Sequence, residues 1–569
     1  MELRTLQDIF FARTTGHDAD NLYVHYKRQR GELYRALSYK EFGDRVRAFA
    51  ASLAHLGIAN GERILISSES SPEWTVTDFA AILTGAVSVP VYPTLTAKQV
   101  EYILKDSGAV AAVVSNDFQL RKILASLPAA PALKHIIVMD TSVSLPEVSG
   151  VTFYYFSELE REGILRSFDR RDPSEEDLVT IIYTSGTTGD PKGVMLTHRN
   201  LVSNVHGALD SIPSVRPSDI FLSFLPLSHA FERIASYFLF FAGGQVAYAE
   251  SIESMAENML EIRPTIMTAV PRFFERLHSR ILSTRDKMPI YRRMIFDWGV
   301  RTGKAYAKKI EQLPVSLHAK TMYPLANKLV LSKIRSRTGG RIRFLVSGGA
   351  ALNPEIGRTF AAFGLTILEG YGLTETSPVV AVNRIDSLQW GTVGKPLPGV
   401  EVGIAEDGEI LIRGANVMKG YFNDDKVTAE MIDSEGWLHS GDIGVLSAEG
   451  ILKITDRKKN IIVLANGKNI TPTRIEALLE ESPLIEQAVV VGEKKDYCGV
   501  LLVSTASTEQ LQAEINRVNK DLAAFEKLRK FGTIAEPFTI ENGMMTPTLK
   551  IRRKEVEKRY GELIESMYK

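Results

Sequence analysis

The chain contains 569 residues, and its hydrophobic fraction of 44% and charged fraction of 24% are typical of a folded globular protein, which excludes a disordered or fibrous class. Its 68 basic and 68 acidic residues cancel, so the net charge gives no reason to expect nucleic acid as a partner. The single cysteine, Cys498, excludes an intramolecular disulfide and a multi-cysteine metal site, and we expect a buried thiol in a reducing compartment.

The amino-terminal segment, MELRTLQDIF, lacks the basic-then-apolar order of a secretory signal. The longest charge-free stretches are residues 79–97, which contain two prolines, and residues 234–249, which contain paired glycines. Neither stretch is expected to span a bilayer. We therefore predict a cytoplasmic protein, and peripheral contact with the inner face of the membrane stays open.

Short β-branched runs alternate with helical periods along most of the chain. RILIS at 63–67 precedes a helical stretch at 72–84, and the same order recurs at LVTIIY (178–183), TIMTAV (265–270) and RFLVSGG (343–349). Such alternation predicts βαβ units with binding loops at the carboxyl ends of the strands. We expect an α/β fold whose large body of mostly parallel sheets occupies residues 1–456.

Residues 457–569 are predicted to form a small, mobile α+β domain. After LKITDRKKNIIVL, which begins at residue 452, the strand-like runs are QAVVVGE and GVLLVS. Helices are predicted at 473–481 and from Thr508 onward.

Residues 184–193, TSGTTGDPKG, follow the apolar run LVTIIY and combine three glycines, four hydroxyl side chains and Lys192. Glycines allow backbone N–H groups to surround phosphate oxygens, and the lysine adds a cation. The segment is not a Walker loop, because Pro191 precedes the lysine and Gly193 follows it. Taken alone, its alternative is a generic polar turn, which the combination of residues makes the less favoured of the two.

This segment resembles the signature of the acyl-adenylate-forming (AMP-binding) superfamily. Further motifs of that superfamily follow in the expected order and extend over nearly the whole chain: LPLSHAFER (225–233), VSGGAAL (346–352), EGYGLTETSP (369–378), GWLHSGDIG (436–444), ITDRKKNIIV (454–463) and TPTLKIRR (546–553). A chance set of ordered motifs is far rarer than any one motif alone.

The resemblance implies a two-step reaction with ATP, CoA and a carboxylic acid as substrates and Mg²⁺ as cofactor. The acid first displaces pyrophosphate from ATP to form an acyl-adenylate, and the acyl group then passes to CoA. By the same resemblance, the phosphates would contact Thr184, Ser185, Gly186, Thr187, Thr188, Gly189 and Lys192. Glu375, together with Thr184, would hold Mg²⁺, for which oxygen ligands are suitable.

The family pattern also assigns the rest of the nucleotide site. Tyr371 would stack on adenine, with Gly349 and Ala350 on the other face. Thr374 would contact the α-phosphate, and Asp442 would accept hydrogen bonds from both ribose hydroxyls. The remaining nucleotide contacts would come from Glu369, Gly370, Gly372 and Arg457.

The resemblance makes Lys459 the hinge about which the carboxy-terminal domain turns. In one pose Lys550 would reach the acid and the α-phosphate; its motif ends Thr-Leu-Lys instead of the commoner Ser-Gly-Lys, which leaves the assignment intact. In the other pose, the NGKNI segment would face CoA through Gly467, Lys468 and Asn469. His229 would lie at the acyl pocket, although a structural histidine is an alternative.

Three segments resemble long-chain fatty acyl-CoA synthetases in particular: LSHAFER, MIFDWGVRTGKAYAKKI and KLVLSKIRSRTGGRIRFLVSGGAAL. The alternatives are a fatty acyl-AMP ligase that loads an acyl carrier protein, and a non-catalytic lipid-binding relative. The catalytic reading is favoured by the presence of Lys192, Glu375, Asp442, Arg457 and Lys550. The sequence decides neither the acyl chain length nor the oligomeric state, for which a homodimer is one alternative.

Residues 291–343 carry thirteen Lys or Arg against two acids, Asp297 and Glu311. Apolar residues recur there at helical spacing beside the basic ones, as in a helix that rests on anionic lipid. An ordinary helix packed on the core would show a similar stripe. We therefore expect either a peripheral membrane contact or a buried helix in this segment.

Overall fold

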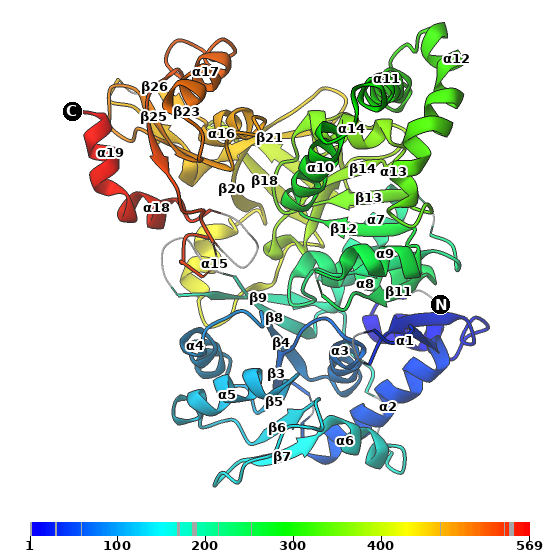
Figure 1. Cartoon of the computed structure of the whole chain (residues 1–569). Helices are drawn as coiled ribbons and strands as arrows, with labels where there is room; N and C mark the ends of the chain where they lie inside the picture. The colour runs from blue at the N-terminus through cyan, green and yellow to red at the C-terminus, as the bar shows by residue number, and fades with distance from the viewer. Residues whose placement is uncertain are drawn as a thin grey trace. The chain divides into compact units, whose positions relative to one another are not determined.

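The computed structural model describes residues 3–28, 31–58, 60–167, 171–184, 190–213, 215–251, 253–466, 468–539, 541–545 and 551–569 (Figure 1). The chain divides into two compact units. The first comprises Met1–Phe274, Thr284–Glu401 and Ile412–Leu438, and the second comprises Glu275–Ser283, Val402–Leu411 and His439–Lys569.

An eight-stranded sheet forms one part of the first unit, in the order β19-β9-β8-β4-β3-β5-β6-β7. Strands β3 to β8 pair in parallel, whereas β9 runs antiparallel to β8 and β19 antiparallel to β9. The strands are β3 (Arg63–Ser67), β4 (Val87–Val91), β5 (Ala111–Val114), β6 (His135–Val138), β7 (Thr152–Tyr155), β8 (Leu178–Thr184), β9 (Lys192–Thr197) and β19 (Gly420–Tyr421).

Helices cover both faces of this sheet, so its central strands are continuous apolar runs without alternation. Figure 1 shows α4 and α5 on one side of the strands and α2, α3 and α6 on the other. In α4, Val100, Ile103 and Leu104 follow helical spacing and pack on Leu65 and Val114 of the strands. The helices are α2 (Tyr39–His55), α3 (Pro72–Thr84), α4 (Ala97–Ser107), α5 (Asp117–Ser126) and α6 (Phe156–Gly163).

A nine-stranded sheet forms the other part of the first unit, in the order β16-β15-β14-β13-β12-β10-β11-β1-β2. Its centre, from β14 to β1, is parallel, and both edges are antiparallel. The strands are β1 (Leu22–Tyr26), β2 (Arg35–Ser38), β10 (Ile220–Ser223), β11 (Gln245–Tyr248), β12 (Ile266–Ala269), β13 (Phe344–Ser347), β14 (Ile367–Gly372), β15 (Val379–Val382) and β16 (Lys395–Pro396).

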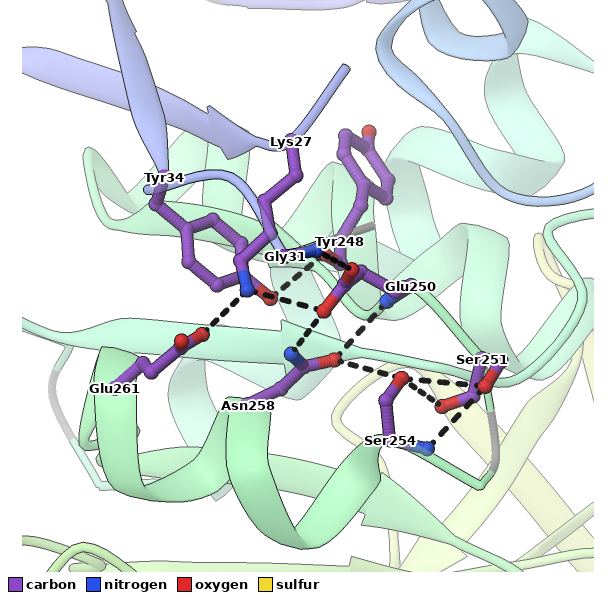
Figure 2. Close-up of polar contacts among 9 residues, drawn as sticks. All are labelled: Lys27, Gly31, Tyr34, Tyr248, Glu250, Ser251, Ser254, Asn258 and Glu261. Carbon is purple, nitrogen blue, oxygen red and sulfur yellow. Dashed lines mark hydrogen bonds and ion pairs between the residues drawn. The ribbon is translucent and has the colours of Figure 1, made fainter. Parts of the chain in front are cut away.

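The β1–β2 hairpin is joined to the segment after β11 by an ion-pair cluster around the buried Lys27 side chain, which Figure 2 shows. The Lys27 side chain is 4% exposed, and its Nζ lies 3.0 Å from Glu250 Oε2 and 2.6 Å from Glu261 Oε2. Asn258, on α9 (Met255–Ile262), donates to the same Glu250 oxygen at 2.8 Å. Because the cation is neutralised within the cluster, we assign it a structural function.

The basic segment predicted at residues 291–343 folds mainly as helices, in the order α11 (Ile290–Ala307), η2 (Lys308–Glu311), α12 (Leu317–Ala326), η3 (Asn327–Leu331) and α13 (Ser332–Ser336). One face of α11 is buried through Phe296, Gly299 and Gly303, while Tyr291 and Met294 are exposed. The segment therefore has both a packed face and an exposed apolar face. Among the described residues, no helix combines the length and apolar character needed to cross a membrane.

The second unit is built largely on β20 (Leu438–Leu446), β21 (Leu452–Arg457) and a three-stranded sheet, ordered β24-β25-β26. These last strands are Gln487–Val491, Cys498–Val503 and Leu528–Ile534, and α16 (Pro472–Glu480) and α17 (Thr508–Val518) pack on them through a core that includes Ile475, Leu511 and Ile515. Cys498 belongs to this core, as expected, and burial raises the pKa of its thiol to about 11.

Candidate functional site

The predicted phosphate-binding segment joins two antiparallel strands of the eight-stranded sheet. Thr184 is the last residue of β8 and lies opposite Lys192, the first residue of β9. Both are half-buried, whereas residues 179–183 of β8 are buried, so the end of the strand carries the chain from the core toward the surface. The other predicted phosphate ligands, Ser185, Gly186, Thr187, Thr188 and Gly189, lie outside the described residues.

Lys192 and Glu375 both lie beside one aromatic residue, Tyr421. The Lys192 Nζ lies 5.4 Å from the centre of the Tyr421 ring, and the Tyr421 hydroxyl donates to Glu375 Oε1 at 2.9 Å. Tyr421 is positioned by β19, which pairs with β9 opposite Val194. Burial, followed by the charge of Glu375, raises the pKa of Tyr421, so its hydroxyl keeps the proton that it donates.

This arrangement fits a magnesium ion shared with ATP. Glu375 supplies one half-buried carboxylate near the phosphate-binding strands, and among the described residues there is no group of three or more His, Cys, Asp or Glu that could hold a metal alone. Magnesium is commonly held by one or two carboxylates together with substrate phosphates. A single carboxylate is therefore a suitable donor set, provided that the nucleotide brings the remaining ligands.

The predicted adenine contacts follow two neighbouring strands of the nine-stranded sheet. Ser347, at the end of β13, lies opposite Glu369 of the parallel strand β14. After β13 the chain turns at Gly349, whose φ of +86° favours glycine, and reaches the exposed Ala350. Tyr371 is half-buried in β14, so the structure brings both predicted faces of the adenine site to one sheet edge.

Glu369, Gly372 and Thr374 fix the shape of this edge. Burial raises the pKa of Glu369 to about 7, and its carboxylate accepts the Gly391 N–H at 3.2 Å. A Cβ at Gly372 would lie 1.7 Å from the Pro378 carbonyl oxygen, so only glycine fits there, while nothing closer than 3.7 Å would meet one at Gly370. Thr374 begins the 3₁₀ helix η4 (Thr374–Thr376), which also carries Glu375.

His229 has a structural function that sequence reasoning left as an alternative. It is the N-cap of α8 (Ala230–Ala242), where its Nδ1 accepts the Phe231 N–H at 3.1 Å. Its ring centre lies 6.3 Å from that of Tyr92 in an edge-on arrangement. The cap fixes the tautomer, because a nitrogen that accepts a hydrogen bond carries no proton.

In the second unit, Asp442 and Arg457 lie opposite each other on β20 and β21. The Arg457 Nε lies 3.0 Å from Asp442 Oδ1; the Asp442 side chain is 4% exposed and that of Arg457 is 46% exposed. Two predicted nucleotide contacts, fifteen residues apart in the sequence, are thus brought together. A buried carboxylate beside an exposed cation could accept two hydroxyl groups while the cation binds an adjacent anion.

The predicted hinge lies in η5 (Lys458–Asn460), where Lys459 is exposed. On its amino-terminal side, Lys458 pairs with Glu409 at 2.9 Å, and Asp456 Oδ1 accepts the Thr473 hydroxyl at 3.1 Å. The side chains next to the predicted hinge are therefore held by hydrogen bonds.

Of the predicted CoA contacts, Lys468 is exposed, with its Nζ 5.8 Å from the centre of the Phe525 ring. Asn469 begins the short strand β23 (Asn469–Ile470), which pairs with Val463. Gly467 and Lys550 lie outside the described residues.

Sequence reasoning missed two features of the first unit: Tyr421, and the contact partner of Arg233. Tyr421 follows a glycine in an otherwise ordinary polar stretch, and its proximity to Glu375 depends on the pairing of β19 with β9, more than 220 residues away in the sequence. Arg233 is the last residue of the LPLSHAFER motif, yet its contact with Asp78 joins positions 155 residues apart. An alignment of co-varying positions is the signal that could have found such pairs.

Comparisons with known families agree with this geometry. Residues 11–422 match the family described as AMP-binding enzyme, and residues 459–569 match the AMP-binding enzyme C-terminal domain.

Among curated proteins, the chain is 34% identical over 584 residues to the long-chain-fatty-acid–CoA ligase FadD15 of Mycobacterium bovis, covering 97% of this chain and 96% of the relative. It is 30% identical to the chloroplastic long-chain-fatty-acid–[acyl-carrier-protein] ligase AEE15 of Arabidopsis thaliana, covering 94% and 82%. The adenylation domain of a carboxylate reductase from Mycobacterium chelonae superposes with a TM-score of 0.80 at 23% identity, covering 99% of this chain and 91% of that domain, and so has the same fold.

Proposed function

The chain belongs to the AMP-binding enzyme family, and we propose that it joins a long-chain fatty acid to CoA through an enzyme-bound acyl-adenylate. One observation carries the proposal: Lys192 and Glu375, a cation and a carboxylate suited to ATP and its magnesium, both lie next to Tyr421 beside the end of β8. Similarity to long-chain-fatty-acid–CoA ligases over nearly the whole chain supports the choice of acid and acceptor.

In the first step, a carboxylate oxygen of the acid attacks the α-phosphorus of ATP, and the bond to pyrophosphate breaks. Lys192 balances phosphate charge, and Lys550 contacts the acid and the α-phosphate. Glu375 and the Thr184 hydroxyl would hold Mg²⁺, which would supply positive charge to neutralise phosphate oxygens. Such catalysis depends mainly on positioning and on fixed cations.

The proposal also assigns contacts to the nucleoside. Tyr371 stacks on adenine opposite Gly349 and Ala350. Asp442 accepts hydrogen bonds from the ribose hydroxyls, and Arg457 binds the ribose or a phosphate. Thr374 contacts the α-phosphate. Support comes from the positions of these residues at strand ends and on facing strands.

In the second step, the CoA sulfur attacks the acyl carbon and AMP leaves. Residues 457–569 turn about Lys459 between the steps, so that Lys550 withdraws and the segment Gly467, Lys468 and Asn469 faces CoA. His229 guides the opening of the acyl pocket, in addition to capping α8.

The test is ATP–pyrophosphate exchange with acids of increasing chain length, followed by thioester formation with CoA. We expect exchange with long-chain acids and a thioester with CoA. Lys192→Met is a matched negative control, because it removes the phosphate cation while keeping the length of the side chain. The proposal would be contradicted if none of the acids supported exchange, or if Lys192→Met catalysed exchange as fast as the wild type.

The alternative acceptor is an acyl carrier protein, which the name of one relative at 30% identity specifies. The relatives named long-chain-fatty-acid–CoA ligase, at up to 34% identity, favour CoA instead. Normal exchange without CoA thioester formation, together with loading of holo-acyl carrier protein, would identify that activity. The two acceptors therefore give opposite results in the same pair of assays.

We also propose that α11 makes peripheral contact with anionic membrane within residues 291–343. Ile290, Tyr291 and Met294 are 77%, 57% and 66% exposed, and they lie in the first turns of the helix beside the exposed Arg292 and Arg293. Apolar insertion with flanking cations is typical of a helix at a membrane surface, where each cation adds about 1 kcal/mol.

Vesicle sedimentation tests this contact. Arg292, Arg293 and Arg301 are replaced by glutamine; Lys304 is kept, because it is ion-paired with Glu355. The matched control replaces three exposed lysines outside the basic segment: Lys98, Lys105 and Lys134. We expect only the first triple variant to lose binding to anionic vesicles at low salt. Equal retention of both triple variants would exclude this surface.

A further inference from the structure

Arg233, in the second turn of α8, is the most densely bonded buried side chain of the first unit that the proposed chemistry does not use. The side chains of Arg233 and Asp78 are 2% and 1% exposed, and the guanidinium binds both carboxylate oxygens of Asp78, one of them through Nε at 3.1 Å. Tyr237 accepts from the same Nε at 3.0 Å and donates to Asp78 at 2.5 Å. The ion pair is therefore completed by hydrogen bonds.

The two terminal nitrogens of the same guanidinium also contact the eight-stranded sheet. Arg233 Nη1 donates to the Thr180 hydroxyl at 2.8 Å, and Nη2 donates to the Ser88 hydroxyl at 2.8 Å. Thr180 in turn donates to the Ser88 carbonyl oxygen at 2.8 Å, which links β8 to β4. Thr180 lies on β8, four residues before Thr184, so the contact is made on the strand that leads into the phosphate segment.

The neighbouring residue, Glu232, holds the same helix to the nine-stranded sheet. Its carboxylate accepts the hydroxyl of Ser223 on β10 at 2.6 Å and that of Thr268 on β12 at 2.5 Å. Consecutive residues of α8 thus bind opposite sheets of the first unit. The helix cannot shift relative to either sheet without breaking buried hydrogen bonds, which are costly to leave unmade.

We propose that Arg233 is a positioning residue for adenylation. It fixes the distance between α8, whose N-cap is His229, and β8, whose end is Thr184, and so between the acid and the phosphates of ATP. The inference rests on the proposed function, because it concerns the alignment of those two reactants. An apolar pair could fill the same space with comparable stability, so the buried ion pair is better explained by the geometry that it specifies.

Loss of the Arg233 contacts should therefore slow acyl-adenylate formation and leave thioester formation unaffected. Alignment of reacting groups matters steeply, and a displacement of about 1 Å can slow a reaction about 100-fold. Attack of CoA on an acyl-adenylate already formed does not require the acid and the triphosphate to be aligned. A general loss of structure would instead lower both steps together.

The experiment measures two rates per active site: single-turnover acyl-adenylate formation at saturating ATP and acid, and thioester formation from supplied acyl-adenylate and CoA. Thr180→Val removes the hydroxyl that Arg233 binds, and Thr180→Ser restores it. We expect Thr180→Val to slow the first rate about 100-fold and leave the second within about twofold, with Thr180→Ser close to wild type.

Thr75→Val is the matched control. It removes another buried threonine hydroxyl of the same unit, one that is 2.5 Å from the Tyr248 hydroxyl and outside the Arg233 contacts. Ser88→Ala is the second test variant if Thr180→Val does not fold. Equal loss of both rates in the test variants, or an equal defect in Thr75→Val, overturns the inference. Absence of acyl-adenylate formation in the wild type would overturn the proposed function instead.

Discussion

Tyr421 contacts two charged groups that we propose to bind ATP and its magnesium. Its ring lies beside the Lys192 ammonium and its hydroxyl donates to Glu375, while β19 holds its backbone against β9. A hydrogen bond to a carboxylate fixes the direction of the remaining oxygen lone pairs. The tyrosine can therefore orient Glu375 toward magnesium without contacting the ion itself.

Replacing Tyr421 by phenylalanine should lower the apparent affinity for Mg²⁺ in the exchange reaction. The change removes one hydrogen bond to a charged group, worth about 1.5 kcal/mol, and should raise the Mg²⁺ concentration for half-maximal exchange about 10-fold. Tyr34→Phe, which removes a tyrosine hydroxyl bonded to the Tyr248 carbonyl oxygen, is the control. An unchanged magnesium dependence in Tyr421→Phe would show that Glu375 is oriented by other contacts.

Glu232 should make stability depend on pH. Burial raises its pKa from 4.5 to about 7, although four hydrogen-bond donors oppose this rise. The folded protein then keeps a proton that the unfolded chain has lost, so the resulting stabilisation is present below about pH 4.5 and disappears as the pH rises through about 7. Relative to Glu232→Gln, the wild type should lose up to about 3 kcal/mol of unfolding free energy between about pH 5 and pH 8.

Thermal or urea unfolding of both proteins across that range measures the difference. A difference that stays constant with pH would mean that Glu232 is ionised throughout, with its four donors outweighing burial.

The helices and strands of the first unit show which structural elements local sequence can specify. Continuous β-branched runs at 63–67, 87–91 and 178–183 form buried strands, because a sheet covered on both faces needs apolar side chains on both. The turn back from β8 to β9 was not predicted. VMLT after Lys192 has no feature that distinguishes a strand pairing antiparallel with β8 from the start of a helix, and tertiary contact decides.

The hinge prediction concerns η5. Proline at position 459 would fix φ near −65° and restrict the preceding residue, so the turn could adopt only one pose. We expect Lys459→Pro to retain acid-dependent ATP–pyrophosphate exchange and to lose most thioester formation. Lys459→Ala, which removes the side chain but leaves the backbone free, should keep both. Normal CoA transfer by Lys459→Pro would place the hinge at another residue.

Across the chain as a whole, the division into two compact units agrees with a reaction that proceeds in two steps. Of the predicted nucleotide contacts, Tyr371 and Glu375 belong to the first unit, and Asp442 and Arg457 belong to the second. The motif order in the sequence was enough to predict these residues. Their pairing was not, since it depends on strand registers and on contacts between residues far apart in the chain.

Lys550→Ala should impair acyl-adenylate formation, the step that Lys459→Pro is expected to retain. Its ammonium is proposed to act only while the acid and the α-phosphate react, so exchange should fall by about 100-fold or more. Thioester formation from supplied acyl-adenylate should be nearly unchanged. Lys554→Ala, which removes an exposed lysine of α18 (Arg553–Arg559), is the control. Equal losses in both half-reactions would refute the assignment of Lys550 to one pose.

The burial of Cys498 has a practical consequence for observing the proposed turning of residues 457–569 about Lys459. The thiol is fully buried and its pKa is raised to about 11, so at neutral pH it presents neither the access nor the thiolate that alkylating dyes require. With no other cysteine in the sequence, the natural chain is effectively silent toward maleimides. One cysteine introduced in place of exposed Lys134 and another in place of exposed Lys520 would each accept a fluorophore, and energy transfer between the two could follow the units through turnover while the native Cys498 is kept.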